Sequence, residues 1–235
     1  MTYRDRLVYA AFVKRSPLFP INSVMTHGIT ITKNGPPRSM SKEPANCIKE
    51  IRSHIGCGTC LQELYVDRDL LSQENGRLWD ELASGIKWLR RNEDVLADIH
   101  WVGGHPWDDA AGDGCVYGRA AWGPEKCTLT LRNSNGSEKT LTASLREILD
   151  VPPSVRKDKV KVRSSFKDQR NISVLLSGSI DIDKVLNITL KPQEVIVLEG
   201  VCAAGKQKEE KEEADDAPAD KKKGRKKSKK KKSSK

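Results

Sequence analysis

One short segment, Asp98–Asp109, contains two histidines, three acidic residues and two tryptophans. Its sequence is DIHWVGGHPWDD. Such a set of side chains could hold a metal ion or stack against a sugar. The spacing does not fit zinc, because His100 and His105 are not four residues apart and no cysteine pair accompanies them. Gly103 and Gly104 favour a connector whose aromatic side chains pack between two domains. We therefore predict no metal site.

The second candidate is Cys57-Gly-Thr-Cys60, the one CxxC motif of the sequence. A redox-active pair needs a helix amino terminus directly after a strand, where the helix dipole lowers the thiol pKa. Here the motif follows a predicted helix and precedes a predicted strand, which favours two ordinary thiols in a turn. Six cysteines in a chain of 235 residues are too sparse for a disulfide framework, and a reducing compartment would keep them as thiols. No nucleotide-binding glycine motif is present, and no cofactor is predicted.

The elements that must position these residues begin with an α/β pattern. A β-branched run near Val24–Thr32 predicts one buried strand, and Leu61–Val66 predicts a second. Between them, Pro44 suits a first helical turn, and apolar residues at helical spacing predict a helix that ends at Gly56 or Gly58.

A longer amphipathic helix is predicted after Ser72, which is a candidate N-cap. Its apolar stripe consists of Leu78, Leu82, Ile86, Leu89 and Leu96. The order strand, helix, strand, helix predicts parallel strands joined by crossover helices.

From residue 115 the sequence consists of short runs in which apolar and polar residues often alternate. This pattern is typical of an antiparallel β-sandwich. The segment 133–136, NSNG, predicts a tight hairpin because asparagine and glycine tolerate a positive φ. The runs are CVYGRAAW, CTLTLRN, KTLTASL, KVKVRSSF, ISVLLSG, VLNITL and EVIVLEG.

The predicted fold class is therefore α/β plus all-β. We expect an α/β segment at 1–98, a linker at 99–114, a β-sandwich at 115–202 and a disordered charged tail at 203–235.

Four segments resemble the C-terminal portion of glycoside hydrolases of the α-galactosidase-like superfamily, in particular large members labelled enterotoxin-like. They are PLFPINSVMTHGI, GTCLQELYV, KWLRRNEDVLADIHWVGGHP and VYGRAAWGPEKCTLTLRN, and the resemblance extends over roughly residues 2–200. In that family a (β/α)8 barrel precedes a β-sandwich with a tyrosine-glycine-tryptophan-alanine strand. Here the strand is Tyr117–Trp122, and Arg119 replaces its second aromatic residue.

The resemblance implies a partial (β/α) barrel segment, because a complete barrel takes about 250 residues and two strand-helix units fit before residue 98. The family's catalytic aspartates lie on earlier strands, so the resemblance implies a truncated or remnant hydrolase without its own catalytic pair. Asp5 resembles the region just after the acid/base strand, and no catalytic residue is predicted.

At the strand ends of the implied barrel, the candidate sugar ligands are His27, Glu63 and Tyr65. The alternatives are that Glu63 pairs with an arginine and that His27 caps a strand end.

The C-terminal tail is the strongly charged part of the chain. Residues 206–235 hold 14 Lys or Arg and 7 Asp or Glu, a net charge of +7. The other 205 residues hold 28 Lys or Arg and 25 Asp or Glu, a net charge of only +3. The tail has no aromatic residue to fold around or to stack on bases. The basic block would attract nucleic acid or another anionic partner without sequence preference, or act as a nuclear-import signal or a solubilising tail. The block includes Lys221, Lys222, Lys223, Arg225, Lys226 and Lys227.

Three functions follow from these patterns: a glycoside-hydrolase-like protein of carbohydrate metabolism, a non-catalytic carbohydrate or protein interaction module, and a basic-tailed protein that associates with anionic surfaces. The sequence has no apolar run of about 18 residues that could span a membrane and no signal-peptide pattern. We therefore expect a cytoplasmic protein, or a nuclear one through its tail. The exposed edges of a partial parallel sheet predict self-association.

Overall fold

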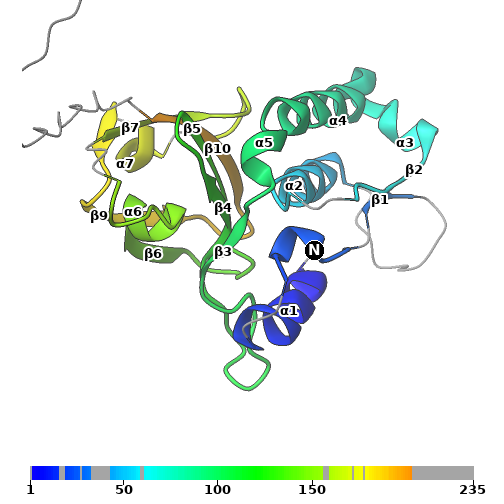
Figure 1. Ribbon diagram of the computed structural model, residues 1–235. Coiled ribbons are helices and arrows are strands. Elements are labelled where there is room, and N and C mark those ends of the chain that lie inside the picture. The colour runs from blue at the N-terminus through cyan, green and yellow to red at the C-terminus, as the bar shows by residue number, and fades with distance from the viewer. Residues whose placement is uncertain are drawn as a thin grey trace, which may run out of the picture. The chain divides into compact units, whose positions relative to one another are not determined.

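The computed structural model describes residues 2–15, 19–26, 28–32, 43–58, 61–155, 159–170, 172–176 and 178–202. Residues 1–205 form one compact unit, and all of the described elements belong to it (Figure 1). His27, Cys60 and the charged tail lie outside the described residues, so the predictions made for them keep that status.

The chain begins with helix α1 (Thr2–Ala11) and two short 3-10 helices, η1 (Val13–Arg15) and η2 (Ile21–Ser23). Strand β1 (Ile29–Ile31) follows and is shorter than the predicted strand, because pairing starts only at Ile29.

Helix α2 (Pro44–Ile55) confirms the predicted helix. Pro44 stands in its first turn, where a missing amide proton costs no hydrogen bond, and Gly56 is its C-cap. Strand β2 (Leu64–Val66) pairs with β1 in parallel, with Ile29 opposite Leu64. The predicted parallel pairing with a crossover helix is therefore confirmed.

The next helical region is divided into three, namely α3 (Arg68–Leu71), α4 (Gln73–Arg91) and α5 (Glu93–Leu96). Ser72 is the N-cap residue of α4, but its hydroxyl donates to the carbonyl of Arg68, 2.9 Å away, and makes no capping bond. Leu96 belongs to α5 rather than to the predicted long helix.

The largest sheet has six antiparallel strands in the order β3-β4-β5-β10-β7-β8. The strands are β3 (His100–Gly103), β4 (Tyr117–Trp122), β5 (Lys126–Arg132), β10 (Val195–Cys202), β7 (Lys159–Ser164) and β8 (Ser179–Asp181). Strand β3 falls in the range 99–114 that the sequence indicates as a linker. The boundaries at 98 and 115 stay a prediction, although β3 already pairs with β4.

A second sheet consists of β6 (Lys139–Ser144) and β9 (Val185–Leu190), which pair antiparallel. Two short helices, α6 (Leu145–Leu149) and α7 (Ser173–Leu176), complete this part.

Two local predictions for this region are wrong. Residues 173–176 of the run ISVLLSG form helix α7 instead of a strand. The NSNG segment is not a hairpin, because β5 and β6, which it connects, belong to different sheets. Its asparagine side chains explain the difference, since Asn133 Nδ2 donates to the carbonyls of Ser137, Leu190 and Lys191 and so fixes a crossing between sheets.

The six-stranded sheet is covered on both faces, by β6, β9 and α6 on one and by α2, α4 and α5 on the other (Figure 1). The first core contains inward residues of both sheets, such as Leu131, Ile188 and Ile196. The second joins the helices to the opposite face of the sheet through Ala121 and Val197. The α/β part thus packs on the β part through a continuous apolar layer.

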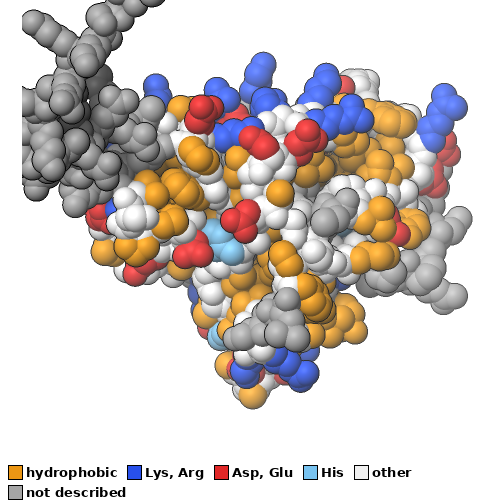
Figure 2. All heavy atoms as spheres, in the orientation of Figure 1, with side chains coloured by type: hydrophobic (Ala, Val, Ile, Leu, Met, Phe, Trp, Pro, Cys, Tyr) orange, Lys and Arg blue, Asp and Glu red, His pale blue; other side chains and the backbone are white. Residues whose placement is uncertain are grey.

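Within the described residues, no helix is long and apolar enough to cross a membrane. Figure 2 shows lysine and arginine side chains along the edge that α4 forms, with acidic side chains among them. Apolar side chains reach the surface over α1, where Tyr3 is 69% and Leu7 52% exposed.

Candidate functional site

Two of the sequence-predicted ligand residues, Glu63 and Tyr65, lie at strand β2 of the parallel pair. Glu63 directly precedes β2, and its carbonyl accepts a hydrogen bond from the Ile29 amide at 2.9 Å. Gly28 makes this close approach possible, because a Cβ at that position would lie 1.8 Å from the Glu63 carbonyl oxygen. Glu63 therefore lies at the amino end of β2, whereas the sequence predicts a strand-end site of the barrel type, whose active residues lie at carboxyl ends.

Glu63 and Tyr65 are two residues apart, so their side chains project from the same face of the strand. The Tyr65 hydroxyl donates to Glu63 Oε2 at 3.1 Å. This bond to the carboxylate raises the pKa of Tyr65. The sequence left open whether Glu63 contacts a sugar or pairs with an arginine. The contact that the structure shows for its carboxylate is with Tyr65 and not with an arginine. Contact of either residue with a sugar stays a prediction.

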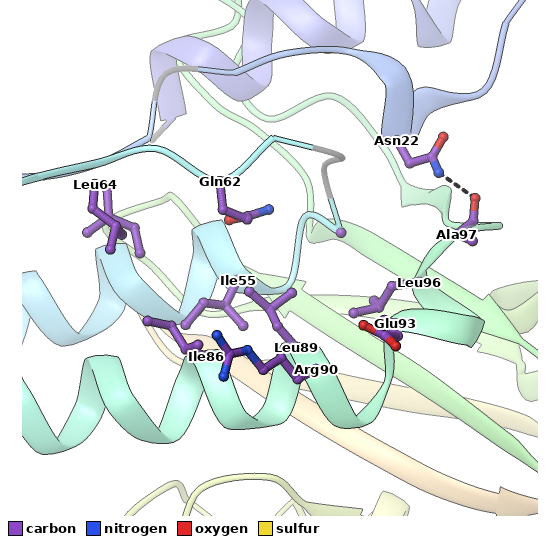
Figure 3. A pocket seen from close by; sticks show the side chains of 12 residues that line it. Asn22, Ile55, Gln62, Leu64, Ile86, Leu89, Arg90, Glu93, Leu96 and Ala97 are labelled. Carbon is purple, nitrogen blue, oxygen red and sulfur yellow. Dashed lines mark hydrogen bonds between the residues drawn. The ribbon is translucent and has the colours of Figure 1, made fainter.

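A cavity of about 490 Å³ lies beside the same strand (Figure 3). Its walls are mostly apolar and come from α2, α4, α5 and the segment before β2. They comprise Ile29, Ile55, Leu64, Ile86, Leu89 and Leu96, with Asn22, Gln62, Arg90 and Glu93 as polar groups. Gln62 and Leu64 line it, whereas Glu63 and Tyr65 do not. The alternation of side chains along a strand explains this separation.

A buried polar cluster lies where α1 and α2 meet β4. Asp5 is 1% exposed and accepts a hydrogen bond from the Tyr117 hydroxyl at 2.8 Å. Arg119 Nη1 lies 3.8 Å from the other Asp5 oxygen and 2.7 Å from Cys57 Sγ. These contacts join three segments, namely α1, the turn after α2 and β4, and the Asp5–Tyr117 bond alone spans 112 residues, so Asp5 is a structural anchor in this fold.

Aromatic rings cover this cluster. Trp101 stacks on Tyr117 with ring centroids 5.4 Å apart and planes 5° apart, and Tyr9 lies 5.5 Å from Trp101. The Arg119 guanidinium lies 5.2 Å from the centre of the Trp101 ring, a cation-π contact. Arg119 therefore has defined structural contacts with Asp5, Cys57 and Trp101.

Two titratable groups in the cluster are held in their neutral forms. Burial, assisted by the positive charges of Arg4 and Arg119, lowers the pKa of His54 to about 4. Burial raises the pKa of the Cys57 thiol to about 11, and this thiol donates to the Ser53 carbonyl at 3.1 Å. A protonated thiol at pH 7 is a poor nucleophile, which fits the interpretation of Cys57 as an ordinary thiol in a turn.

The histidine-rich segment also has structural contacts. His100 Nε2 lies 2.8 Å from the Ile148 carbonyl oxygen, and His105 Nδ1 lies 3.7 Å from Cys115 Sγ. Among the residues that the structure describes, no group of three or more metal-ligating side chains comes together.

A second, partly buried ion cluster joins α2 and α4 to the β part. Arg52 on α2 pairs with Glu81 on α4 at 2.6 Å and with Asp168 from the β part at 2.5 Å. Its guanidinium also lies 4.5 Å from the centre of the Phe166 ring.

Comparisons with known proteins give matches among solved structures. Neither a family model nor a curated protein matches the sequence. The α-galactosidase I of Mortierella vinacea matches 73% of this chain with 38% of its own, at 14% identity and a TM-score of 0.46. The α-galactosidase of Saccharomyces cerevisiae with raffinose matches 74% of this chain with 45% of its own, at 8% identity and a TM-score of 0.46. A putative α-N-acetylgalactosaminidase from Bacillus halodurans matches 73% of this chain with 36% of its own, at 15% identity and a TM-score of 0.46.

The chain is similar to a part of these structures. It spans less than half of the length of each. The partial resemblance stated from the sequence is confirmed as a structural similarity, and at these identities and TM-scores it implies nothing about activity.

Sequence reasoning missed the cluster around Asp5. It noted Arg119 as an unexpected residue and Asp5 as the first carboxylate, but nothing in the local pattern joins them. The one available signal was an arginine in the otherwise apolar run VYGRAAW, since a charge inside a buried strand requires a partner.

Proposed function

We propose that residues 2–202 form a glycoside-hydrolase-like module of carbohydrate metabolism without a catalytic carboxylate pair of its own. In this proposal the module corresponds to the closing part of a barrel and the sandwich that follows it. Hydrolysis then requires further strand-helix units, from a longer chain or from a partner.

The placement of the carboxylates carries this proposal. Double-displacement hydrolysis requires two carboxyl groups about 5 Å apart on opposite sides of the bond to be cleaved. Asp5 is buried between Tyr117 and Arg119, and Glu63 is bonded to Tyr65. Among the described residues that line the 490 Å³ cavity, Glu93 is the one acid. The described residues that line this cavity thus provide no opposed pair of carboxylates.

Turnover of a 4-nitrophenyl α-galactoside by the full chain tests the proposal. We expect the full chain and its Glu63→Gln variant to hydrolyse this substrate no faster than buffer alone does. Glu93→Gln is tested in the same way, because it removes the acid of the cavity wall. Turnover that is lost in Glu63→Gln, Asp5→Asn or Glu93→Gln would contradict the proposal.

A second candidate is a non-catalytic carbohydrate-binding surface at Tyr65. The observation that favours it is the 48% exposed phenol ring beside the Glu63 carboxylate, an aromatic face next to a hydrogen-bond acceptor for sugar hydroxyls. Galactose titration followed by protein-observed NMR tests it, with Tyr65→Ala expected to abolish the shifts. Trp79→Ala, which removes another exposed aromatic ring (45%), is the control.

We also propose that the basic block at 221–235 attracts nucleic acid or other anionic partners by charge alone. Counterion release makes such binding strongly dependent on salt. Elution from a heparin column below about 0.5 M salt is expected, and replacing Lys221, Lys222 and Lys223 by glutamine should lower the salt needed. Retention above that salt concentration would contradict binding by charge alone.

A further inference from the structure

Two cysteines lie next to each other on adjacent central strands of the six-stranded sheet. Cys127 of β5 is directly opposite Gly200 of β10. Cys202 is two residues beyond Gly200, so its side chain projects from the same face as that of Cys127. Both side chains belong to the core between the two sheets, with Cys127 2% and Cys202 4% exposed.

Gly200 provides the space between the two thiols. A Cβ at residue 200 would lie 2.5 Å from Cys127 Sγ, so any side chain there would displace the sulfur. With glycine in place, the Cys127 sulfur lies against the backbone of β10, on the sheet face from which the Cys202 side chain also projects.

The hydrogen bonding between β10 and the β5 side of the sheet continues to the last residue of β10. The Cys202 amide donates to the Glu125 carbonyl at 2.9 Å, which holds the two strands in register at this point.

The other described cysteines have different surroundings. Cys57 Sγ contacts Arg119 and the Ser53 carbonyl, and Cys115 Sγ contacts His105. Cys47 lies on α2 in the second core. Among the described cysteines, Cys127 and Cys202 are the one pair that the strand register places on neighbouring positions of the same sheet face.

We propose that Cys127 and Cys202 form a cross-strand dithiol site that closes to a disulfide in exchange with a low-molecular-weight disulfide such as glutathione disulfide. In the first step one protein thiolate attacks the glutathione disulfide, forms a mixed disulfide and releases one glutathione thiolate. In the second step the other protein thiolate attacks the mixed disulfide and releases the second glutathione. Two protein thiols are oxidised, one glutathione disulfide is reduced, and two protons pass to solvent.

Cys202 is the first to react in this scheme. It is the last residue of β10, beside Val201, which is 56% exposed, so opening the end of the strand uncovers Cys202 before Cys127. The contact with Cys202 and burial together raise the pKa of the Cys127 thiol. Because the thiolate is the reactive form, closure is slow at pH 7 and accelerates as the pH rises.

The experiment incubates the full chain with glutathione disulfide at pH 8.5, followed by alkylation of remaining thiols, trypsin digestion and mass spectrometry. We expect a cross-linked peptide that joins Cys127 to Cys202, with a mass about 2 Da below the sum of its reduced parts, since two hydrogens are lost. Cys202→Ser and Cys127→Ser should each abolish this peptide, and Cys47→Ser should leave it unchanged.

A Gly200→Ala variant tests the geometry without removing a thiol. The added methyl group occupies the position of the Cys127 sulfur, so we expect closure at least about tenfold slower. Gly136→Ala is the control, because a Cβ there would meet nothing within 4 Å.

Two results would overturn the proposal. One is a stable mixed disulfide on Cys202 while Cys127 stays alkylatable. The other is a disulfide map in which Cys127 or Cys202 joins a different cysteine. If Gly200→Ala fails to fold, either result in the unaltered chain still decides the question.

Discussion

Replacing Arg119 by methionine tests the buried ion cluster as a structural anchor. The change keeps much of the side-chain length and removes the charge that faces Asp5 at 3.8 Å. The side chains of Arg119 and Asp5 are 6% and 2% exposed, so water cannot take the place of the lost partner. At an effective dielectric constant of about 20, two unit charges at this separation attract by about 4 kcal/mol. Breaking one side of a buried pair typically costs about 3–5 kcal/mol.

We therefore expect Arg119→Met to lower the free energy of unfolding by about 4 kcal/mol in urea denaturation followed by circular dichroism. The matched control is Arg6→Met, since Arg6 and Asp109 pair at 2.8 Å at the surface with side chains 36% and 71% exposed. Such exposed pairs contribute up to about 1 kcal/mol.

A double-mutant cycle separates the pair from other contacts of Arg119. The double variant with Asp5→Asn and Arg119→Met has neither of the two buried charges, so no charge is left without its opposite. It should be at least about 1 kcal/mol more stable than the sum of the single changes predicts. The reasoning is refuted if Arg119→Met costs no more than Arg6→Met, or if the two single changes add.

Three further predictions follow from described contacts. The pKa of His54 is lowered from 6.5 to about 4 in the folded state, so the unfolded chain binds more protons between these values and stability falls as the pH drops through this window. Between pH 7.5 and pH 5 this group should cost about 2 kcal/mol in urea titrations, and an unchanged urea midpoint would contradict it. Gly28→Ala places a methyl group against the Glu63 carbonyl and should destabilise the fold by about 2 kcal/mol or more, whereas Gly136→Ala should change stability by less than about 0.5 kcal/mol. Strands β1 and β2 pair only with each other among the described residues, so we expect the chain to self-associate through their open edges, and a stable monomer in light scattering would count against this.

Much of the local structure could be predicted because short-range rules decide it. Pro44 and the isoleucine spacing predict α2, and β-branched residues between turn signals predict most strands of the sheets. These signals depend on residues that are close to one another in the sequence. Gly56 ends α2 for the same reason.

The wrong predictions concern residues whose conformation is decided by distant partners. Asn133 looks like a turn residue, yet its side chain bonds to Leu190, 57 residues away. Arg119 acquires its role from Asp5, and Cys127 and Cys202 lie on neighbouring positions of one sheet face only because of the register of β5 and β10. Sequence patterns carry no information about such register, so these sites required the structure.

Covalent trapping tests the central claim most directly. A retaining glycosidase forms a glycosyl-enzyme intermediate on its nucleophilic carboxylate, and a fluorinated glycosyl fluoride makes that intermediate long-lived enough for intact-mass spectrometry. We predict that the full chain, incubated with such a galactosyl reagent, keeps its unmodified mass. A stoichiometric glycosyl adduct mapped to any aspartate or glutamate of this chain would contradict the account.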